Sequence, residues 1–396
     1  MARMVPGASN LRTCVFLALR ELSFARGRFS LMGVVIALIA VLMVLLSGLS
    51  AGLVNDGVSG LKALPSSTSF AFDAGTKQDN AFSRSVVDEA QLAAWRDQPE
   101  VAEASPMGVS IVNAVTDAGD QVDLTLFGVE PGSFLAPEGS ALDDPGGIVV
   151  SGTAANLDLG TVVTLDRIDT ELEVVGFTDG QATFGHVDIA YLPLATWQLI
   201  AAGEAPGGSP TTEQVAAVDV DEFSVIGLKG VPGSALAAGD AEALAAGDAV
   251  AETTTMSLEE SFNASPGYQA ETLTLSMIQW FLYAIGALVV GAFFTVWTIQ
   301  RSHELAVLRA MGASARYLLR DGLTQAAILL IVFTAVGVGV GVGLGALMPE
   351  GMPFALEAPA IAVASALTIV LGVLGAAVAV LRITRIEPIS ALGGAR

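Results

Sequence analysis

The sequence predicts an α-helical membrane protein with four transmembrane helices, one before and three after a large extracytoplasmic α+β domain. The first observation behind this is composition: the chain is 53% hydrophobic, above the roughly 45–50% of an ordinary soluble domain. The second is that four long runs contain no Asp, Glu, Lys, Arg or His, at residues 31–54, 273–299, 323–348 and 360–381. About 20 such residues cross a hydrocarbon core of about 30 Å as a helix, so each run is long enough to span.

Charge predicts the orientation. Residues 55–272 contain 6 Lys and Arg against 34 Asp and Glu, a net charge of −28, whereas the whole chain carries −22. The remainder is therefore positive, and most of its Arg residues flank the apolar runs. Because cytoplasmic loops retain Lys and Arg, we expect a multi-pass protein of the cell membrane with both termini inside and residues 55–272 outside. So acidic an outer domain argues against a nucleic-acid partner.

Residues 1–30 are predicted to form a cytoplasmic or interfacial N-terminal helix. Leu11, Val15, Leu19 and Leu22 share one helical face, as in a helix that lies in the inner membrane interface. A cytoplasmic extension of the first span is the alternative. The first run is longer than the roughly 7–15 residues of a signal-peptide core, so we expect it to remain as a span. The single cysteine, Cys14, excludes an intrachain disulfide.

The acidic segment is predicted to open with a polar stretch, residues 55–84, followed by a helix over residues 88–95 that Ser85 caps. Segments rich in Val, Ile, Leu and Thr and separated by turn residues predict strands at 109–115, 122–129, 148–151, 161–165, 172–177, 187–192 and 223–228. Residues 201–212 are rich in Gly, Pro and Ala and predict a flexible loop. Residues 236–251 predict a helix with loops, so the domain is α+β.

The third run contains a GxGxG pattern, but no strand-turn-helix surrounds it, so a nucleotide site is not expected. Gly337, Gly341 and Gly345 instead share one helix face at four-residue spacing, which favours close helix packing. A short outer loop, residues 349–359, leads to the fourth run, and residues 382–396 form a cytoplasmic tail.

The spans indicate that the energy source is a different polypeptide. Ion-coupled carriers place ionisable groups within the membrane, and the four runs contain none. The chain also lacks a GxxxxGK[ST] motif, so we expect neither ATP hydrolysis nor another enzymatic activity. No metal and no covalently bound cofactor are expected either. The loop 300–322 is the one substantial internal loop, and its helix-compatible residues 304–311 suit either a partner's groove or the lipid surface.

Three segments carry a family resemblance: ELAVLRAMGAS at 304–314, RIEPISAL at 385–392, and the series GIVVS, TVVTL and EVVG within residues 147–176. The first resembles the coupling segment of FtsX/MacB-type ABC permeases, the second their closing motif, and the third their periplasmic core domain. Residues 27–53 and 267–282 resemble the haem-exporter branch, the HrtB-like or DevC-like permeases. The resemblance implies a homodimer of this chain in the lipid membrane with two ATP-binding subunits beneath it, ATP being bound by the partner.

Within that resemblance, four residues are the expected contact with the ATPase. Leu308 would fill an apolar pocket, Glu304 and Arg309 would pair with charges, and Gly312 would end the coupling helix. Arg309 as a solvated positive-inside residue is the alternative.

The resemblance also implies an apolar substrate that enters from the membrane, with haem as the best candidate. His303 is cytoplasmic, and His186 is expected to be an ordinary surface residue of the loop 184–187. Tyr268, Glu271 and Met277, near the outer end of the second span, are therefore the candidate substrate-binding residues, because Tyr and Met ligate haem iron. The alternatives are an interfacial anchor for Tyr268 and packing for Met277.

Two other functions remain open. The FtsX branch implies a non-transporting relay, in which ATP hydrolysis inside activates an extracellular enzyme. The same mechanics would also serve the export of peptides, lipids or lipoproteins.

Overall fold

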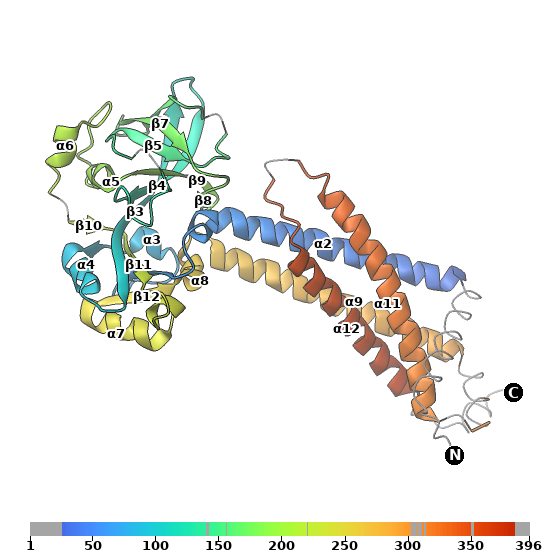
Figure 1. Cartoon of the computed structure of the whole chain (residues 1–396). Helices are drawn as coiled ribbons and strands as arrows, with labels where there is room; N and C mark the ends of the chain where they lie inside the picture. The colour runs from blue at the N-terminus through green and yellow to red at the C-terminus, as the bar shows by residue number, and fades with distance from the viewer. Residues whose placement is uncertain are drawn as a thin grey trace, which may run out of the picture. The chain divides into compact units, whose positions relative to one another are not determined.

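The computed structural model describes residues 26–384, with gaps at 140–141, 156, 220, 302–306, 308–310, 313 and 350–351. Residues 1–25 of the predicted N-terminal helix and residues 385–396 of the predicted tail lie outside the described residues, whereas residues 26–30 and 382–384 belong to long helices. The chain divides into two compact parts: a helical unit, Met1–Gly52 with Leu273–Arg396, and a β-rich domain, Leu53–Thr272 (Figure 1).

Within the described residues, four helices are long and apolar enough to cross a membrane: α2 (Arg26–Lys62), α9 (Tyr268–Gln300), α11 (Ala315–Gly345) and α12 (Ala358–Thr384). They coincide with the four predicted runs. All four extend past a predicted end: α2 continues from residue 54 to Lys62, and α9 begins at Tyr268 rather than at 273. α11 runs from Ala315 to Gly345 rather than over 323–348, and α12 covers Ala358–Thr384 rather than 360–381. Polar residues such as Asn55 and Asp56 end the apolar run without ending the helix.

The expected polar stretch 55–84 is thus partly wrong. Its first residues are helical up to Lys62, with a break at Val58, where φ is −147° and ψ is 20°. Thr68–Asp73 form strand β1, and Ala81–Arg84 form the short helix α3.

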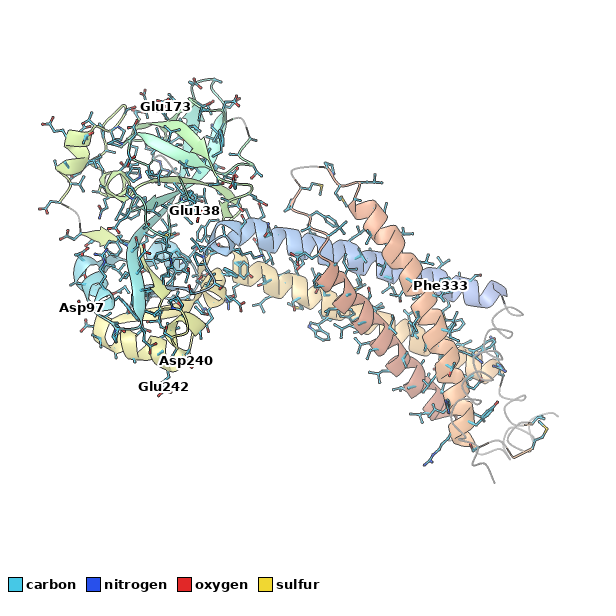
Figure 2. All side chains as sticks on the ribbon, viewed as in Figure 1. Asp97, Glu138, Glu173, Asp240, Glu242 and Phe333 are labelled. Carbon is cyan, nitrogen blue, oxygen red and sulfur yellow. The ribbon has the colours of Figure 1, made fainter. Side chains whose placement is uncertain are left out.

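Glycines allow α2 and α11 to pack closely. A Cβ atom on Gly337 would lie 2.6 Å from Cβ of Ala40, and one on Gly341 would lie 2.8 Å from Cβ of Val44. The ring of Phe333, labelled in Figure 2, occupies the space beside Gly33 that a side chain there would fill. This face of α11 is therefore covered within the chain.

The outer loop adds a second contact of the same kind. A Cβ atom on Gly345 of α11 would lie 2.7 Å from the Phe354 ring, and the same ring also occupies the space beside Gly48 of α2. The amide N–H of Ala355 donates to the carbonyl of Gly48 at 2.9 Å. The loop after α11 is thereby attached to α2.

The β-rich domain is built on one large sheet. Its strands are β1 (Thr68–Asp73), β3 (Val101–Thr116), β4 (Gln121–Val129), β5 (Gly147–Val150), β6 (Val162–Leu165), β7 (Glu171–Phe177), β8 (Thr183–Phe184), β9 (Val187–Pro193), β11 (Val225–Gly230) and β12 (Thr253–Ser257). The order is β12-β1-β11-β3-β4-β9-β5-β7-β6, and β6 also pairs with β3. The strands from β3 to β6 therefore close into a ring, while β12, β1 and β11 extend from β3 as an open sheet. β3 serves both parts because it is 16 residues long.

Short helices accompany the sheet: α4 (Glu89–Arg96), α5 (Leu194–Ala201), α6 (Thr212–Ala216), α7 (Ala241–Ala251) and α8 (Leu258–Ser261). The strands β2 (Val87–Asp88) and β10 (Glu222–Phe223) pair separately. α4 and α7 pack on each other, α4 also on β3 and α7 on β12, as Figure 1 shows. The α+β prediction is confirmed.

The predicted strands are confirmed in type, and the predicted loop 201–212 separates α5 from α6. β1, β12 and α6 were not expected. The predicted cap was wrong: the side chain of Asp88, not Ser85, accepts the amide N–H of Gln91, and the Gln91 side chain accepts the N–H of Asp88. This reciprocal pair satisfies two amides that the first turn of α4 leaves free.

A chain of aromatic rings lies in the core of the β-rich domain. Phe82 of α3 meets Phe70, Phe72 and Phe184 edge-on, with ring centroids 5.1, 5.0 and 5.2 Å apart. Phe184 in turn meets Phe127 at 5.5 Å. All five rings are buried, and edge-to-face pairs of this kind add about 0.5–1.5 kcal/mol each beyond the area that they bury.

Acidic side chains cover the surface of this domain. Asp97, Glu138, Glu173, Asp240 and Glu242, labelled in Figure 2, are all exposed and come from different elements. The negative charge is therefore distributed over the surface and does not mark one site.

Candidate functional site

The candidate site lies within the β-rich domain, where the last residues of α2 and the first residues of α9 meet a hairpin. Strands β8 and β9 form this hairpin, with Thr183 opposite Asp188 and Phe184 opposite Val187. Two residues connect the strands, Gly185 with φ of 60° and His186 with φ of 65°. Two-residue hairpin turns with positive φ at both positions favour Gly and Asn, because other side chains are strained there.

His186 joins the two helices. Its Nδ1 atom lies 2.9 Å from Oδ2 of Asp56 on α2, and its Nε2 atom lies 2.9 Å from Oε2 of Glu271 on α9. The side chains of His186, Asp56 and Glu271 are 27%, 24% and 36% exposed, so all three are partly buried. We call these three residues the histidine bridge.

Buried polar contacts hold the hairpin against the end of α2. The amide N–H of Thr183 donates to Oγ of Ser59 at 2.8 Å, and the two hydroxyl groups of these residues are 2.7 Å apart. The N–H of Gly185 donates to the carbonyl of Gly57 at 2.9 Å, and the hydroxyl of Ser265 donates to the same carbonyl at 3.1 Å. The break in α2 at Val58 frees this carbonyl for both donors.

A glycine on α2 makes room for the bridge. A Cβ atom on Gly57 would lie 3.6 Å from the His186 ring and 3.7 Å from the Tyr268 ring. The remaining oxygen of Asp56 accepts the side-chain amide of Gln181 at 2.8 Å. Both carboxylate oxygens of Asp56 are thus occupied.

The electrostatic balance favours the charged imidazole. Burial alone would lower the pKa of His186, but the hydrogen bonds to Asp56 and Glu271 and their negative charges together raise it above 6.5. On the neighbouring strand, burial raises the pKa of Asp188, hydrogen bonds from Ser151 and Thr153 oppose this, and the charge of Asp56 adds to the increase.

The predicted substrate residues do not converge on one point. Tyr268 and Glu271 lie one turn apart on α9, and both approach the end of α2. Tyr268 also meets Phe262 edge-on, with ring centroids 6.2 Å apart. Met277 is 56% exposed, nine residues along the helix from Tyr268 and hence about half a turn out of phase. Glu271 is engaged by His186.

The predicted coupling residues are not tested by the geometry. Glu304, Leu308 and Arg309 lie outside the described residues. Gly312 is described and has a φ of 100°, a conformation that favours glycine. Gly337 and Gly341 face α2, and Gly345 faces Phe354 of the outer loop.

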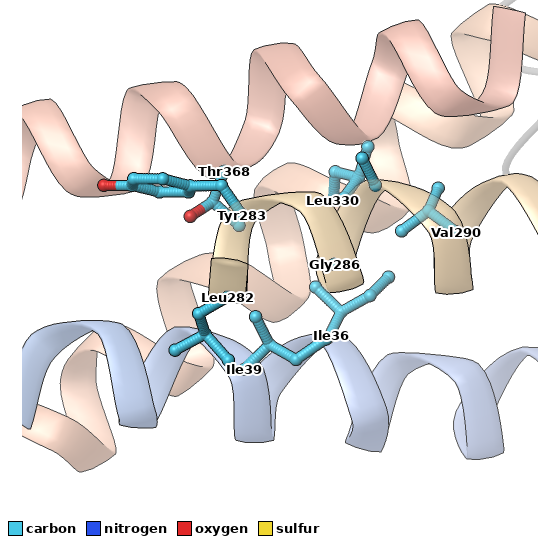
Figure 3. Close-up of a pocket in the computed structure, with 9 residues that line it drawn as sticks. Ile36, Ile39, Leu282, Tyr283, Gly286, Val290, Leu330 and Thr368 are labelled. Atoms are coloured by element: carbon cyan, nitrogen blue, oxygen red, sulfur yellow. The ribbon is translucent and has the colours of Figure 1, made fainter. Parts of the chain in front are cut away.

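A small pocket lies between the helices of the helical unit (Figure 3). The lining residues include Ile36 and Ile39 of α2, Tyr283 and Val290 of α9, and Leu330 of α11, and Thr368 of α12 contributes a hydroxyl group. The open space is about 10 Å³, which holds no more than one water molecule. In the part of the chain that the structure describes, no three His, Cys, Asp or Glu side chains are grouped to hold a metal ion.

Two family models match the chain. The MacB-like periplasmic core domain matches residues 29–218, and the FtsX-like permease C-terminal model matches residues 276–388. The chain belongs to the FtsX/MacB-type permeases. Membership in this family implies a membrane location.

Curated relatives of this permease include the "Putative hemin transport system permease protein HrtB" of Staphylococcus epidermidis, 30% identical over 127 residues, and that of Staphylococcus haemolyticus, 31% identical over the same length. Each match spans 32% of this chain and 36% of the relative, about a third of either protein.

Among solved structures, the periplasmic region of MacB from Actinobacillus actinomycetemcomitans is 12% identical with a TM-score of 0.34, covering 50% of this chain and 92% of that one. The extracellular domain of the transporter YknZ from Gram-positive bacteria is 13% identical with a TM-score of 0.30, covering 48% and 98%. Because both TM-scores are below 0.5, the membership of the permease family rests on the family models and the relatives.

The histidine bridge was missed by sequence reasoning. His186 was expected to be an ordinary surface residue, and this was wrong because both ring nitrogens have partners. These partners are 130 and 85 residues away along the chain, so no local pattern contains them. The one local signal is a Gly-His pair between two strand-like segments, which predicts a tight hairpin with an unfavourable residue in it.

Proposed function

We propose that this permease is the membrane subunit of an ABC exporter that moves a hydrophobic substrate, with haem as the best candidate, out of the membrane by ATP-driven mechanotransmission. The observation that carries the proposal is the continuity of α2 and α9. Each helix contains a predicted span and continues, without leaving the helix apart from the break at Val58, into residues of the β-rich domain. A displacement of either span is thereby passed to the domain through backbone hydrogen bonds.

The histidine bridge gives this transmission its point of attachment. Asp56 and Glu271 lie on the first helical residues beyond the apolar runs, and both are held by the same hairpin. We therefore propose that a movement of the two spans reaches the β-rich domain at strands β8 and β9. In the machine that we propose, two copies of the chain and two ATP-binding subunits operate together, with Glu304, Leu308, Arg309 and Gly312 receiving the push from the ATPase.

The substrate path is assigned to the lipid-facing surface and not to the interior of one copy. The pocket in the helical unit has room for one water molecule, so it does not admit haem. The exposed face of α9 is instead apolar and aromatic, with Met277, Trp280 and Phe281 all more than half exposed. This suits a molecule that arrives sideways from the bilayer, and the names of the staphylococcal relatives support haem.

The test uses the purified permease with its ATP-binding partner in proteoliposomes. We expect added haem to change its absorption spectrum on binding, to stimulate ATP hydrolysis and to be exported. The triple variant Tyr268→Phe, Glu271→Gln, Met277→Leu tests the candidate residues, and Glu259→Gln, at an exposed residue of α8, is the control.

Unchanged haem binding in the triple variant would remove these three residues from the site. ATP hydrolysis without export of haem, lipid or peptide would favour the signal relay instead.

A further inference from the structure

The histidine bridge requires a bound proton. A carboxylate only accepts hydrogen bonds, and a neutral imidazole has one N–H, whereas the imidazolium has two. Both ring nitrogens of His186 lie 2.9 Å from carboxylate oxygens. A neutral ring would satisfy both contacts only if one carboxyl group were protonated, and that arrangement holds the same number of protons. Removing one proton therefore leaves a ring nitrogen and a carboxylate facing each other without a hydrogen.

Other charged groups around the ring do not replace this proton. Asp56 of α2, Glu271 of α9 and Asp188 of β9 are acidic, and the Tyr268 phenol is neutral in the physiological range. Within the described residues, neither carboxylate of the bridge forms an ion pair with Lys or Arg. The ammonium group of Lys62 on α2 donates to the side-chain oxygen of Asn55 at 3.5 Å.

The local backbone gives a second, independent reason to regard His186 as functional. A non-glycine residue at φ of 65° costs about 1 kcal/mol, and Asn or Gly would occupy this turn at lower cost. Strained residues persist where the surroundings hold them, and strain of this kind is frequent at switches. The surroundings here are the two helix ends.

We propose that His186 is a proton-dependent latch: when protonated it ties the ends of α2 and α9 to the β8–β9 hairpin, and when it loses its proton it releases them. The latch deepens the proposed function, on which its role in transport rests, because it makes transmission from the spans to the domain depend on external pH. The latch itself is a property of the chain alone.

The direction of the pH effect follows from the geometry. Because folding raises the pKa of His186 above 6.5, the contribution of the latch is complete below pH 6.5 and is lost as the pH rises through the pKa of the folded protein. An acidic exterior would engage the latch, and an alkaline exterior would open it.

Amide hydrogen exchange of the full-length chain in lipid nanodiscs tests the latch. The amides of Thr183 and Gly185 donate to Ser59 and Gly57, so a peptide covering residues 183–188 reports the attachment to α2. The hairpin around residues 116–120, closed by the N–H of Thr116 on the carbonyl of Asp120, is the internal reference. We expect protection of 183–188, relative to this reference, to fall about tenfold between about pH 5 and about pH 9.

Variants separate the latch from the turn. His186→Asn keeps a residue that suits positive φ but removes the bridge, so protection should be low and should not vary with pH relative to the reference. Glu271→Gln removes one charge that favours the imidazolium, so the loss of protection should move to lower pH. Glu259→Gln, an exposed carboxylate on α8, should leave the profile unchanged. A flat profile in the natural protein, or an unchanged transition in His186→Asn, would overturn the proposal.

The role in transport needs a separate measurement. In proteoliposomes with the ATP-binding partner, export should weaken as the pH rises on the side of the membrane that the β-rich domain faces. Export by the His186→Asn variant should be weak and should not depend on that pH. If the exchange profile behaves as expected but no substrate is exported at any pH, the proposed function fails and the latch stands. If export occurs with a flat exchange profile, the latch fails and the proposed function stands.

Discussion

Ser59→Ala tests whether the buried contact between α2 and the hairpin stabilises the β-rich domain. The hydroxyl of Ser59 accepts the amide N–H of Thr183 at 2.8 Å and lies 2.7 Å from the hydroxyl of that residue. Ser59 is 7% and Thr183 4% exposed, so water does not readily replace the lost partner. Alanine would leave an amide and a hydroxyl group unsatisfied.

The magnitude follows from these two orphan groups. Each buried, unsatisfied polar group costs about 1–3 kcal/mol, and we take about 2–4 kcal/mol for the pair because each side chain keeps a little access to water. For a domain of this size, 1 kcal/mol corresponds to a shift of about 2–4 °C in the melting temperature. We therefore expect Ser59→Ala to melt roughly 4–16 °C lower than the natural protein.

The assay is thermal unfolding of the full chain followed by tryptophan fluorescence. Replacing Trp280 and Trp297 by Phe confines the signal to Trp95 and Trp197, which are 0% and 7% exposed in the β-rich domain. Ser69→Ala is the matched control, since Ser69 is 1% exposed and its hydroxyl has no hydrogen-bond partner within the described residues. Equal melting temperatures for the two variants would refute the reasoning.

Three further predictions follow. Gly337→Leu should force α11 away from α2 and lower the melting temperature of the helical unit, at a cost of about 1–3 kcal/mol. Gly339→Leu should be tolerated, because a Cβ atom there meets nothing within 4 Å, and scanning calorimetry of both variants measures the difference. Leu308→Asp should abolish stimulation of the partner's ATP hydrolysis without preventing membrane insertion, and unchanged stimulation and assembly would rule out the coupling assignment. Thr183→Val should cost about 1 kcal/mol, less than Ser59→Ala, because it removes a hydroxyl group and keeps the amide bond to Ser59, and the same fluorescence melt measures it.

The membrane helices were predictable because their signal is local. A run of about 20 apolar residues requires no knowledge of its neighbours, and all four runs became helices. Their ends were less predictable. Asp56 and Glu271 interrupt the apolar pattern but remain helical, because the end of a helix depends on backbone partners and not on hydropathy.

The β-rich domain shows where local reasoning ends. Strands with many Val and Ile residues were found, whereas β12, with the sequence TTTMS, was not, because it is a strand through its pairing with β1. Ser85 was assigned as a cap because a helix followed it, but Asp88 is the residue whose side chain reaches the first turn. The histidine bridge joins three segments that are far apart in the sequence, so the sequence indicated the hairpin turn but not the partners of His186.

The ring of Phe184 connects the β8–β9 hairpin to the core of the β-rich domain. Phe184 precedes the Gly185-His186 turn directly and is wedged between Phe82 and Phe127, one from helix α3 and one from strand β4. Because protein interiors are close-packed, a tilt of the hairpin would also move these two neighbouring rings. A displacement of the His186 imidazole would therefore be passed through the Phe184 ring to helix α3 and strand β4.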